Sequence, residues 1–256
     1  MPSKPMPEKT NNDGWIAATW PAPDHIHAGT TTRRGGISKP PYATFNLADH
    51  VGDDQKNVST NRELLRKQLN LPAEPCWLQQ IHGNRVITAQ TAEPTVPADG
   101  VLTDQANTVC AVLTADCLPL LLCDTQGTQI AAIHVGWKGF SNDIIANAVE
   151  MFSVKREHIM AWLGPCISAN QYEIGYEVRD ACLKICRVAE HAFTPGRNGH
   201  WFADLYRLVR CQLGHLGIEN IHGGDYCTYG DAHLFFSHRR DGVTGRMASL
   251  IWMDSF

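Results

Sequence analysis

Three residues that can bind a metal or act as nucleophiles lie at the ends of apolar runs. Cys117 follows the apolar run that ends at Thr114, and His134 closes the next such run along the chain. His82 occupies a similar place between an apolar run and a loop. Strands that pair bring their ends together, so one thiol and two imidazoles are expected to converge. Three protein ligands with a fourth position free for water is the pattern of a catalytic zinc site.

The same residues also fit other chemistries. Cys117 can be a small buried core residue, with the histidines hydrogen-bonded in loops. It can equally be a nucleophile, with His134 as its base and Asp116 nearby, because thiolate catalysis uses the same residue types as metal binding. The long separations along the chain mean that only tertiary structure can assemble these groups, so the alternatives stay open.

Two classes of metalloenzyme do not match the sequence. A cytidine-type zinc deaminase needs H-x-E followed by P-C-x-x-C. No glutamate stands two residues after His82, and the next cysteine after Cys117 is Cys123. A multicopper oxidase should carry several His-x-His pairs, whereas this chain has only His25 and His27. The first fold is excluded, and a true laccase architecture is not expected.

Composition favours one globular domain in the cytoplasm. The chain has 256 residues, 43% of them hydrophobic, and a formal net charge of -4. Without a basic excess, nucleic acid is not an expected partner. No apolar run is long enough for a membrane span, and residues 1–14 look like a disordered tail without a signal-peptide core. The domain is predicted over residues 15–256, as a monomer or homodimer, with most of the nine cysteines reduced.

Helix-like and strand-like patterns interleave without a regular βαβ repeat. Residues 29–42 are rich in Gly, Ser, Thr and Pro and predict an irregular loop. Helices are predicted over residues 56–69, 142–152, 175–189 and 204–216. Strands are predicted over residues 76–78, 86–88, 109–114, 118–123, 129–134 and 159–163, with a C-terminal hairpin at 234–237 and 247–252. The patterns predict a single mixed α/β domain of the α+β type.

A series of ordered motifs closely resembles the YfiH family, also called laccase-domain or peptidoglycan-editing-factor proteins. The resemblance runs from about Ala28 to the C-terminus. The motifs that carry it are Thr31 to Ser38, Phe45 to Leu47, Val51 to Asp53, Asn61 and Arg62, Gln80 to Gly83, Ala98 to Gly100, Thr114 to Pro119, His134 to Gly139, Leu163 to Pro165, Cys227 to Tyr229, Phe236 to Asp241 and Thr244 to Arg246. So many matches in the same order make the resemblance specific.

The resemblance implies packed mixed sheets and helix layers, and zinc on the family's His, Cys and His, which fall on His82, Cys117 and His134. It also implies phosphorolysis of adenosine, inosine, guanosine and methylthioadenosine, together with deamination of adenosine. Other labels attached to such proteins are copper-dependent polyphenol oxidase and a cell-wall precursor editing amidase, for which Cys117 and His134 are the expected catalytic pair.

Phosphorolysis requires an anion-binding group, because phosphate attacks the ribose while the purine leaves. Arg33 and Arg62 are the expected phosphate-binding residues, and Asn46 is expected to position the substrate. Each arginine can equally belong to a structural ion pair. Asp116 is expected to move protons at the metal, and Trp137 either stacks on a purine or lies in the core. The other C-terminal arginines are expected to brace the predicted hairpin: Arg239, Arg240 and Arg246.

Overall fold

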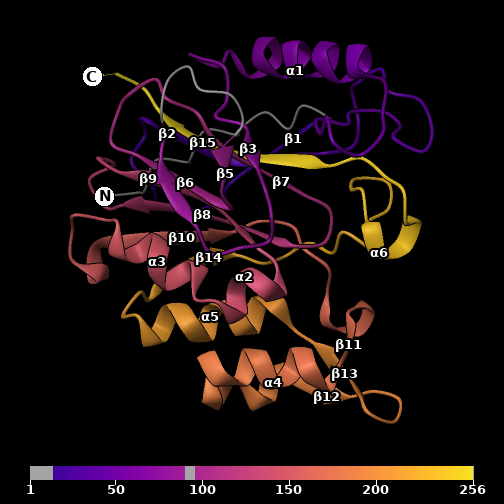
Figure 1. The fold of residues 1–256 in the computed structure, drawn as a ribbon. Coiled ribbons are helices and arrows are strands. Elements are labelled where there is room, and N and C mark those ends of the chain that lie inside the picture. The colour runs from indigo at the N-terminus through magenta and orange to yellow at the C-terminus, as the bar shows by residue number, and fades with distance from the viewer. Residues whose placement is uncertain (1–13, 90–95, 256) are drawn as a thin grey trace, which may run out of the picture.

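Two β-sheets pack face to face and carry helices on their outer faces, as the computed structural model shows for residues 14–89 and 96–255 (Figure 1). The first sheet is antiparallel throughout. Its strands, in spatial order, are β1 (Trp15–Ala17), β2 (Ile26–Thr31), β15 (Met247–Met253) and β7 (Cys110–Thr114). The first and last parts of the described chain therefore share one sheet.

The second sheet is mixed, with antiparallel central pairs and a parallel pair at each edge. Its strands, in spatial order, are β14 (Asn220–Gly223), β10 (Ile159–Leu163), β8 (Leu118–Asp124), β9 (Ile130–Val135), β6 (Gly100–Thr103) and β4 (Val86–Thr88). Two smaller sheets contain β11 (Glu173–Gly175), β13 (His200–Ala203) and β12 (Phe193–Pro195), and β3 (Leu78–Gln79) with β5 (Val96–Pro97).

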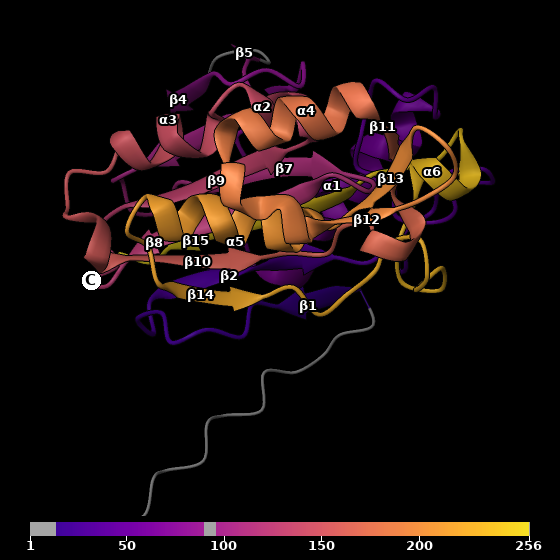
Figure 2. The ribbon, with the colours of Figure 1, turned by 90° about the horizontal axis from the view of Figure 1, so that it is seen from below.

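Helices cover both outer faces. The helix α1 (Gln55–Leu69) packs on the first sheet, where its Leu65 lies in one apolar cluster with Leu113 and Leu250. The outer face of the second sheet is covered by α2 (Trp137–Ser141), α3 (Ile144–Glu150), α4 (Tyr176–Ile185) and α5 (Leu205–His215). Figure 2 shows the molecule from the side of these helices. The remaining helical segments are short: η1 (Arg156–His158), η2 (Ala169–Gln171), η3 (Arg187–Ala192) and α6 (His238–Asp241).

The central strand β8 is buried on both faces, because successive side chains point into two different cores. Leu120 and Leu122 pack toward the helices, together with Ile133 of β9. Leu121 and Cys123 pack toward the first sheet. This double burial explains why the strand is a continuous apolar run in the sequence, without polar alternation.

The predicted α+β class and the layers of sheets and helices are confirmed, with differences at several boundaries. The predicted loop over residues 29–42 begins later, because Gly29 to Thr31 complete β2. The helix predicted over residues 175–189 is divided, since the backbone leaves helical geometry at Cys186 between α4 and η3. The tail predicted over residues 1–14 lies outside the described residues except for its last one.

The predicted C-terminal hairpin is wrong. Leu234 ends a turn and residues 235–237 have no regular secondary structure, while β15 pairs instead with β2 and β7. Phe235 and Phe236 are apolar because they fill a buried cluster with Met247. Ser237 then begins α6 by accepting a hydrogen bond from the Arg240 amide. A short apolar run can thus be a buried irregular segment as well as a strand.

The prediction that most cysteines are reduced holds for seven of them, while Cys186 and Cys211 form a disulfide. In the described part of the chain, no helix combines the length and apolar character required to cross a membrane.

Candidate metal centre

His82, Cys117 and His134 converge at one end of the second sheet. One potential ligand atom from each lies within 4.8 Å of the others. The pairing of β8 with β9 sets Pro119 opposite His134, which brings Cys117 in the preceding turn close to that histidine. His82 comes from the loop after β3, and its ring lies 4.7 Å from the His134 ring, measured between centroids.

Asp99 holds both histidines in place from a fully buried position. Its Oδ1 accepts hydrogen bonds from His134 Nδ1 at 2.8 Å and from the backbone N–H of His82 at 2.9 Å. Its Oδ2 accepts from the amides of Ile81 and Gly83. With Nδ1 of His134 occupied, Nε2 is left to bind a metal, in the manner of a carboxylate–histidine–metal triad. Burial opposes ionisation, but these hydrogen bonds lower the pKa of Asp99.

Gly136 has no side chain, which leaves room for the Cys117 and His82 side chains to approach each other. A Cβ atom at this position would lie 3.0 Å from Cys117 Sγ and 3.2 Å from Cδ2 of His82. Glycine is therefore required here by close approach rather than by backbone conformation.

The thiol and the imidazoles polarise one another. Burial favours the neutral thiol, yet the charge and hydrogen bonds of His134 and His82 lower the pKa of Cys117 to about 6. In turn, the pKa of His134 is raised against the effect of burial by the Cys117 thiolate and by Asp99. The metal-free protein thus holds a thiolate–imidazolium pair, and a metal ion would displace the proton.

The donor set fits one borderline-soft divalent ion. One thiolate and two imidazoles are ligands suited to zinc, and they leave a coordination position open. His82 is exposed, so that position is accessible from solvent. A multinuclear copper centre would need further ligand groups. Within the described residues, the other group of three consists of Cys186, Cys211 and His215, in which both cysteines form the disulfide.

Asp116 precedes Cys117 in the chain, and both oxygens of its carboxylate accept hydrogen bonds from other residues. Its Oδ1 accepts a hydrogen bond from the Thr228 hydroxyl and its Oδ2 from the Arg239 amide, both at 2.6 Å. The carboxylate therefore ties the ligand turn to the start of α6. Asp116 thereby positions the turn that carries Cys117, and its expected role in proton transfer stays a prediction.

Asn46 and Arg62 have structural contacts. Asn46 is fully buried, and its amide bonds to the Ala48 backbone, to Asp53 and to the N–H of Arg246. Arg62 donates to the carbonyl of Leu47 and stacks on Trp77 at 4.3 Å. The polar atoms of Asn46 are thus bonded to protein groups, and its expected role in positioning the substrate stays a prediction.

Arg33 stacks on Phe236 at 4.7 Å and donates to the carbonyls of Ala43 and Ala232. Burial lowers the pKa of Arg33, and the nearby charge of Arg240 lowers it further. Arg33 thus joins the N-terminal loop to the segment before α6. None of these contacts involves a metal ligand.

Arg246, which the sequence analysis assigned to a hairpin brace, is electrostatically coupled to the candidate centre. Burial lowers the pKa of Arg246, whereas the negative charges of Cys117 and Asp116 raise it. Its guanidinium donates to the carbonyls of Thr244 and Gly245, which fixes its direction.

Two aromatic residues border the same region. Burial raises the pKa of Tyr172, and the charge of Cys117 is the next cause, which places this phenol within electrostatic reach of the thiolate. Arg239 stacks on the Tyr172 ring at 5.2 Å. Trp137 begins α2 and packs partly against the core, with Lys138 over its ring at 5.7 Å.

Asp99 and Arg246 were not expected at the site from the sequence. Both lie in motifs that carry the family resemblance, but neither stands at a conspicuous strand end. For Asp99, the available signal was a carboxylate between Ala98 and Gly100 at the start of an apolar run. Such a buried carboxylate requires several hydrogen-bond donors.

Comparisons with known proteins agree with this architecture. A family model described as multi-copper polyphenol oxidoreductase laccase matches residues 27–254. A protein of Shigella flexneri named purine nucleoside phosphorylase YfiH is 45% identical over 240 residues, covering 93% of this chain and 98% of the relative. The crystal structure of Neisseria meningitidis protein NMB0706 has a TM-score of 0.91 at 42% identity, covering 94% of this chain and all of the other (100%).

The crystal structure of a Bacillus licheniformis protein named YfiH superposes with a TM-score of 0.90 at 29% identity, over 95% of this chain and 98% of the other. The match to the family model spans almost the whole described domain. The chain therefore belongs to the YfiH family, whose model is described as multi-copper polyphenol oxidoreductase laccase.

Proposed function

We propose that this protein is a zinc-dependent purine nucleoside phosphorylase that binds its metal through His82, Cys117 and His134. The observation that carries the proposal is the cluster of three candidate ligands with a buried carboxylate behind it, together with an arginine whose pKa is raised by the charge of Cys117. The name of the Shigella flexneri relative supports the same reaction. When bound, zinc would polarise a substrate oxygen or acidify a water molecule.

Asp99 fixes the tautomer of His134 and the path of the His82 loop. Because both ligands depend on one buried carboxylate, the geometry of the centre is set before substrate binds. Such preorganisation avoids rearrangement during the reaction.

Arg246 is the phosphate-binding residue that the charge distribution around the candidate centre favours. Phosphate has to approach the ribose close to the metal, and Arg246 is the arginine that interacts with Cys117 and Asp116. Asn46 supports it indirectly, because its Oδ1 accepts a hydrogen bond from the Arg246 backbone at 3.0 Å. Arg33 and Arg62 then stabilise the fold around the site, although they were the first choices from sequence.

The proposed substrates are adenosine, inosine, guanosine and methylthioadenosine, with deamination of adenosine as a second activity. Tyr172, which is half-buried and responds to the charge of Cys117, offers an aromatic surface for a purine next to Arg239, and Trp137 is the alternative. Both activities require only a small uncharged nucleoside and phosphate or water.

A cell-wall precursor amidase is the second candidate, favoured by the thiolate–imidazolium pair of Cys117 and His134. The two functions assign Cys117 different roles. As a ligand it is protected by zinc, and chelators abolish activity. As a nucleophile it acts without metal, and chelators leave activity intact.

The test is to incubate zinc-loaded protein with inosine or adenosine, with and without phosphate, and to measure free base and ribose 1-phosphate. We expect the parent protein to release free base only when phosphate is present. The Cys117→Ala and His134→Ala variants should lose both this activity and the bound zinc. Absence of turnover by the zinc-loaded protein would contradict the proposal and favour the amidase.

A further inference from the structure

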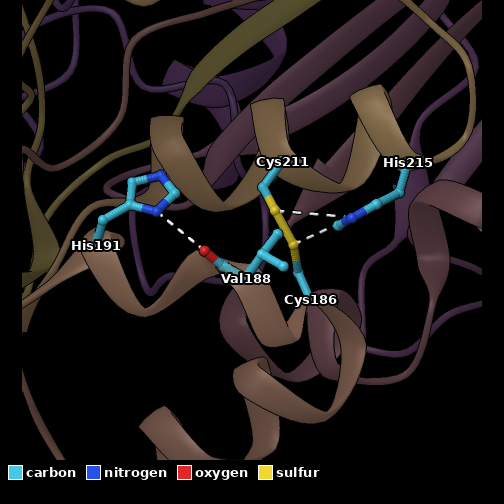
Figure 3. Close-up of a disulfide and its surroundings, with 5 residues drawn as sticks. All are labelled: Cys186, Val188, His191, Cys211 and His215. Atoms are coloured by element: carbon cyan, nitrogen blue, oxygen red, sulfur yellow. Dashed lines mark hydrogen bonds between the residues drawn. A yellow bond between two sulfur atoms is a disulfide. The ribbon is translucent and has the colours of Figure 1, made fainter.

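A disulfide between the end of α4 and α5 faces a histidine. Cys186 follows α4, and Cys211 lies within α5. Nδ1 of His215 is 3.3 Å from Sγ of Cys186 and 3.8 Å from Sγ of Cys211 (Figure 3). All three potential ligand atoms lie within 4.8 Å of one another.

The chemistry of this group changes when the disulfide is reduced. A disulfide sulfur is a poor partner for an imidazole, whereas two thiolates and an imidazole are ligands that thiophilic ions prefer. We propose that Cys186, Cys211 and His215 form a second metal site in the reduced protein, suited to zinc. The site is independent of the proposed activity and uses none of the residues of the first centre.

The distances from His215 Nδ1 to the two sulfurs already suit a tetrahedral ion. Cys211 and His215 are four residues apart on α5, so their side chains lie on the same face of the helix. Zinc bonds of about 2.3 Å to sulfur and about 2.0 Å to nitrogen place these atoms about 3.6 Å apart at a tetrahedral angle. The observed sulfur–nitrogen distances of 3.3 and 3.8 Å bracket this value.

Only the two sulfurs have to separate when the ion binds. The Cα atoms of the two cysteines are 6.7 Å apart, close to the upper limit of about 6.8 Å seen in disulfides. Cys186 also lies at the junction of α4 and η3, where the backbone is not helical. A small rotation of its side chain can therefore open the sulfur pair without bending either helix.

An open pocket of about 460 Å³ gives access to the site. Its lining residues are Val188, His191, Arg207, Arg210, Cys211, Gly214 and His215. Arg207 pairs with Asp204 and donates to the His191 carbonyl, while Arg210 donates to two carbonyls near β14. Two thiolates balance the charge of a divalent ion, and the pocket leaves room for water as the fourth ligand.

The redox step needs an external reductant. A trialkylphosphine breaks the S–S bond, takes oxygen from water to become the phosphine oxide, and delivers two electrons and two protons to the sulfurs. The metal ion then replaces the two thiol protons, which are released to solvent. The oxidised pair cannot bind the ion in this way because neither sulfur is a thiolate.

The test uses the full chain carrying Cys117→Ser, which removes the thiolate of the first centre. The phosphine-reduced, desalted protein is titrated anaerobically with Co²⁺, and thiolate-to-cobalt charge-transfer absorption is recorded before competition with Zn²⁺. We expect absorption that saturates at about one equivalent and is lost on zinc addition, and none in the oxidised protein.

Matched variants locate the signal. Cys211→Ser should abolish most of the absorption, and His215→Ala, on an exposed helix face, should weaken binding about tenfold or more without unfolding. Cys76→Ser, at a cysteine outside both groups, should leave it unchanged. No charge-transfer band on reduction, or one that survives Cys211→Ser, would overturn the second site.

Discussion

Asp99 and His134 form a buried pair in which Oδ1 of the carboxylate lies 2.8 Å from Nδ1 of the imidazole. The pairing of β6 with β9 places Gly100 opposite Ile133, so Asp99 and His134 are adjacent across the sheet. The same carboxylate accepts hydrogen bonds from the loop that carries His82. One residue therefore controls the orientation of two of the three candidate ligands.

Replacing Asp99 with Asn should weaken zinc binding about 10- to 100-fold, because the second shell of a metal site sets ligand orientation and basicity. The new amide would also turn an NH₂ group toward backbone N–H donors that the carboxylate now satisfies. Zinc affinity is measured by competition with a chromophoric chelator.

The control is Asp104→Asn, at an exposed carboxylate just after β6. This change should leave zinc affinity as in the parent protein. Equal affinities of Asp99→Asn and the parent would show that the carboxylate does not act through the metal ligands.

In the metal-free protein, Cys117 should be alkylated by iodoacetamide at a rate that is half-maximal near pH 6, the region of its lowered pKa of about 6. The direction follows from the depressed pKa: the thiolate persists at neutral pH and is lost as the pH falls through that value. An ordinary thiol would reach half its maximal rate near pH 8.5, a value of about 8.5 being usual for cysteine.

Zinc should protect Cys117 from this reaction, and Cys117→Ser should remove the fast-labelled site on mass spectra. Labelling that is equally fast with and without zinc would indicate that the sulfur is not a ligand, and would favour the nucleophile of the amidase alternative.

Gly136→Ala should abolish metal binding while the protein stays folded, because the added Cβ would crowd Cys117 Sγ and the His82 ring. The matched change is Gly214→Ala, in α5, where a Cβ meets no atom within 4 Å. That substitution should stabilise the protein by about 0.5–1 kcal/mol through helix propensity. Metal content and thermal unfolding are measured for both, and full metal content in Gly136→Ala would contradict the close packing of the ligands.

The sequence was sufficient to predict three candidate ligands that the structure brings together, but not the residues that support them. His82, Cys117 and His134 were recognisable because polar metal-binding residues interrupt or end apolar runs. The role of Asp99 depends on which strands are neighbours, and the pairing of β6 with β9 is not visible in local patterns. Arg246 was missed for a similar reason, since its electrostatic interaction with Cys117 depends on the tertiary path of the segment before β15.

The fold shows the same division between local and long-range information. The strand over residues 159–163 has the predicted bounds, because its five buried residues stand between clear boundaries. The strand β15 was located, but its partner was wrongly taken to be residues 234–237. Phe235 and Phe236 resemble strand residues in the sequence because both are apolar, and both are buried in the structure. Burial alone, however, does not determine backbone conformation.

Arg246→Gln should raise the KM for phosphate about 10- to 100-fold, which corresponds to the loss of one charge-assisted hydrogen bond of about 1.5–3 kcal/mol. Arg62→Gln is the comparison, because Arg62 was the choice from sequence but contacts Leu47 and Trp77 in the structure. It should lower thermal stability and leave the KM for phosphate unchanged. Initial rates of inosine cleavage at varied phosphate give the KM for phosphate of both variants, with zinc content measured in parallel.

Arg246→Lys, which keeps the charge, should recover part of the lost affinity for phosphate. If Arg62→Gln raises this KM and Arg246→Gln does not, phosphate binds at α1 and the assignment made here is wrong.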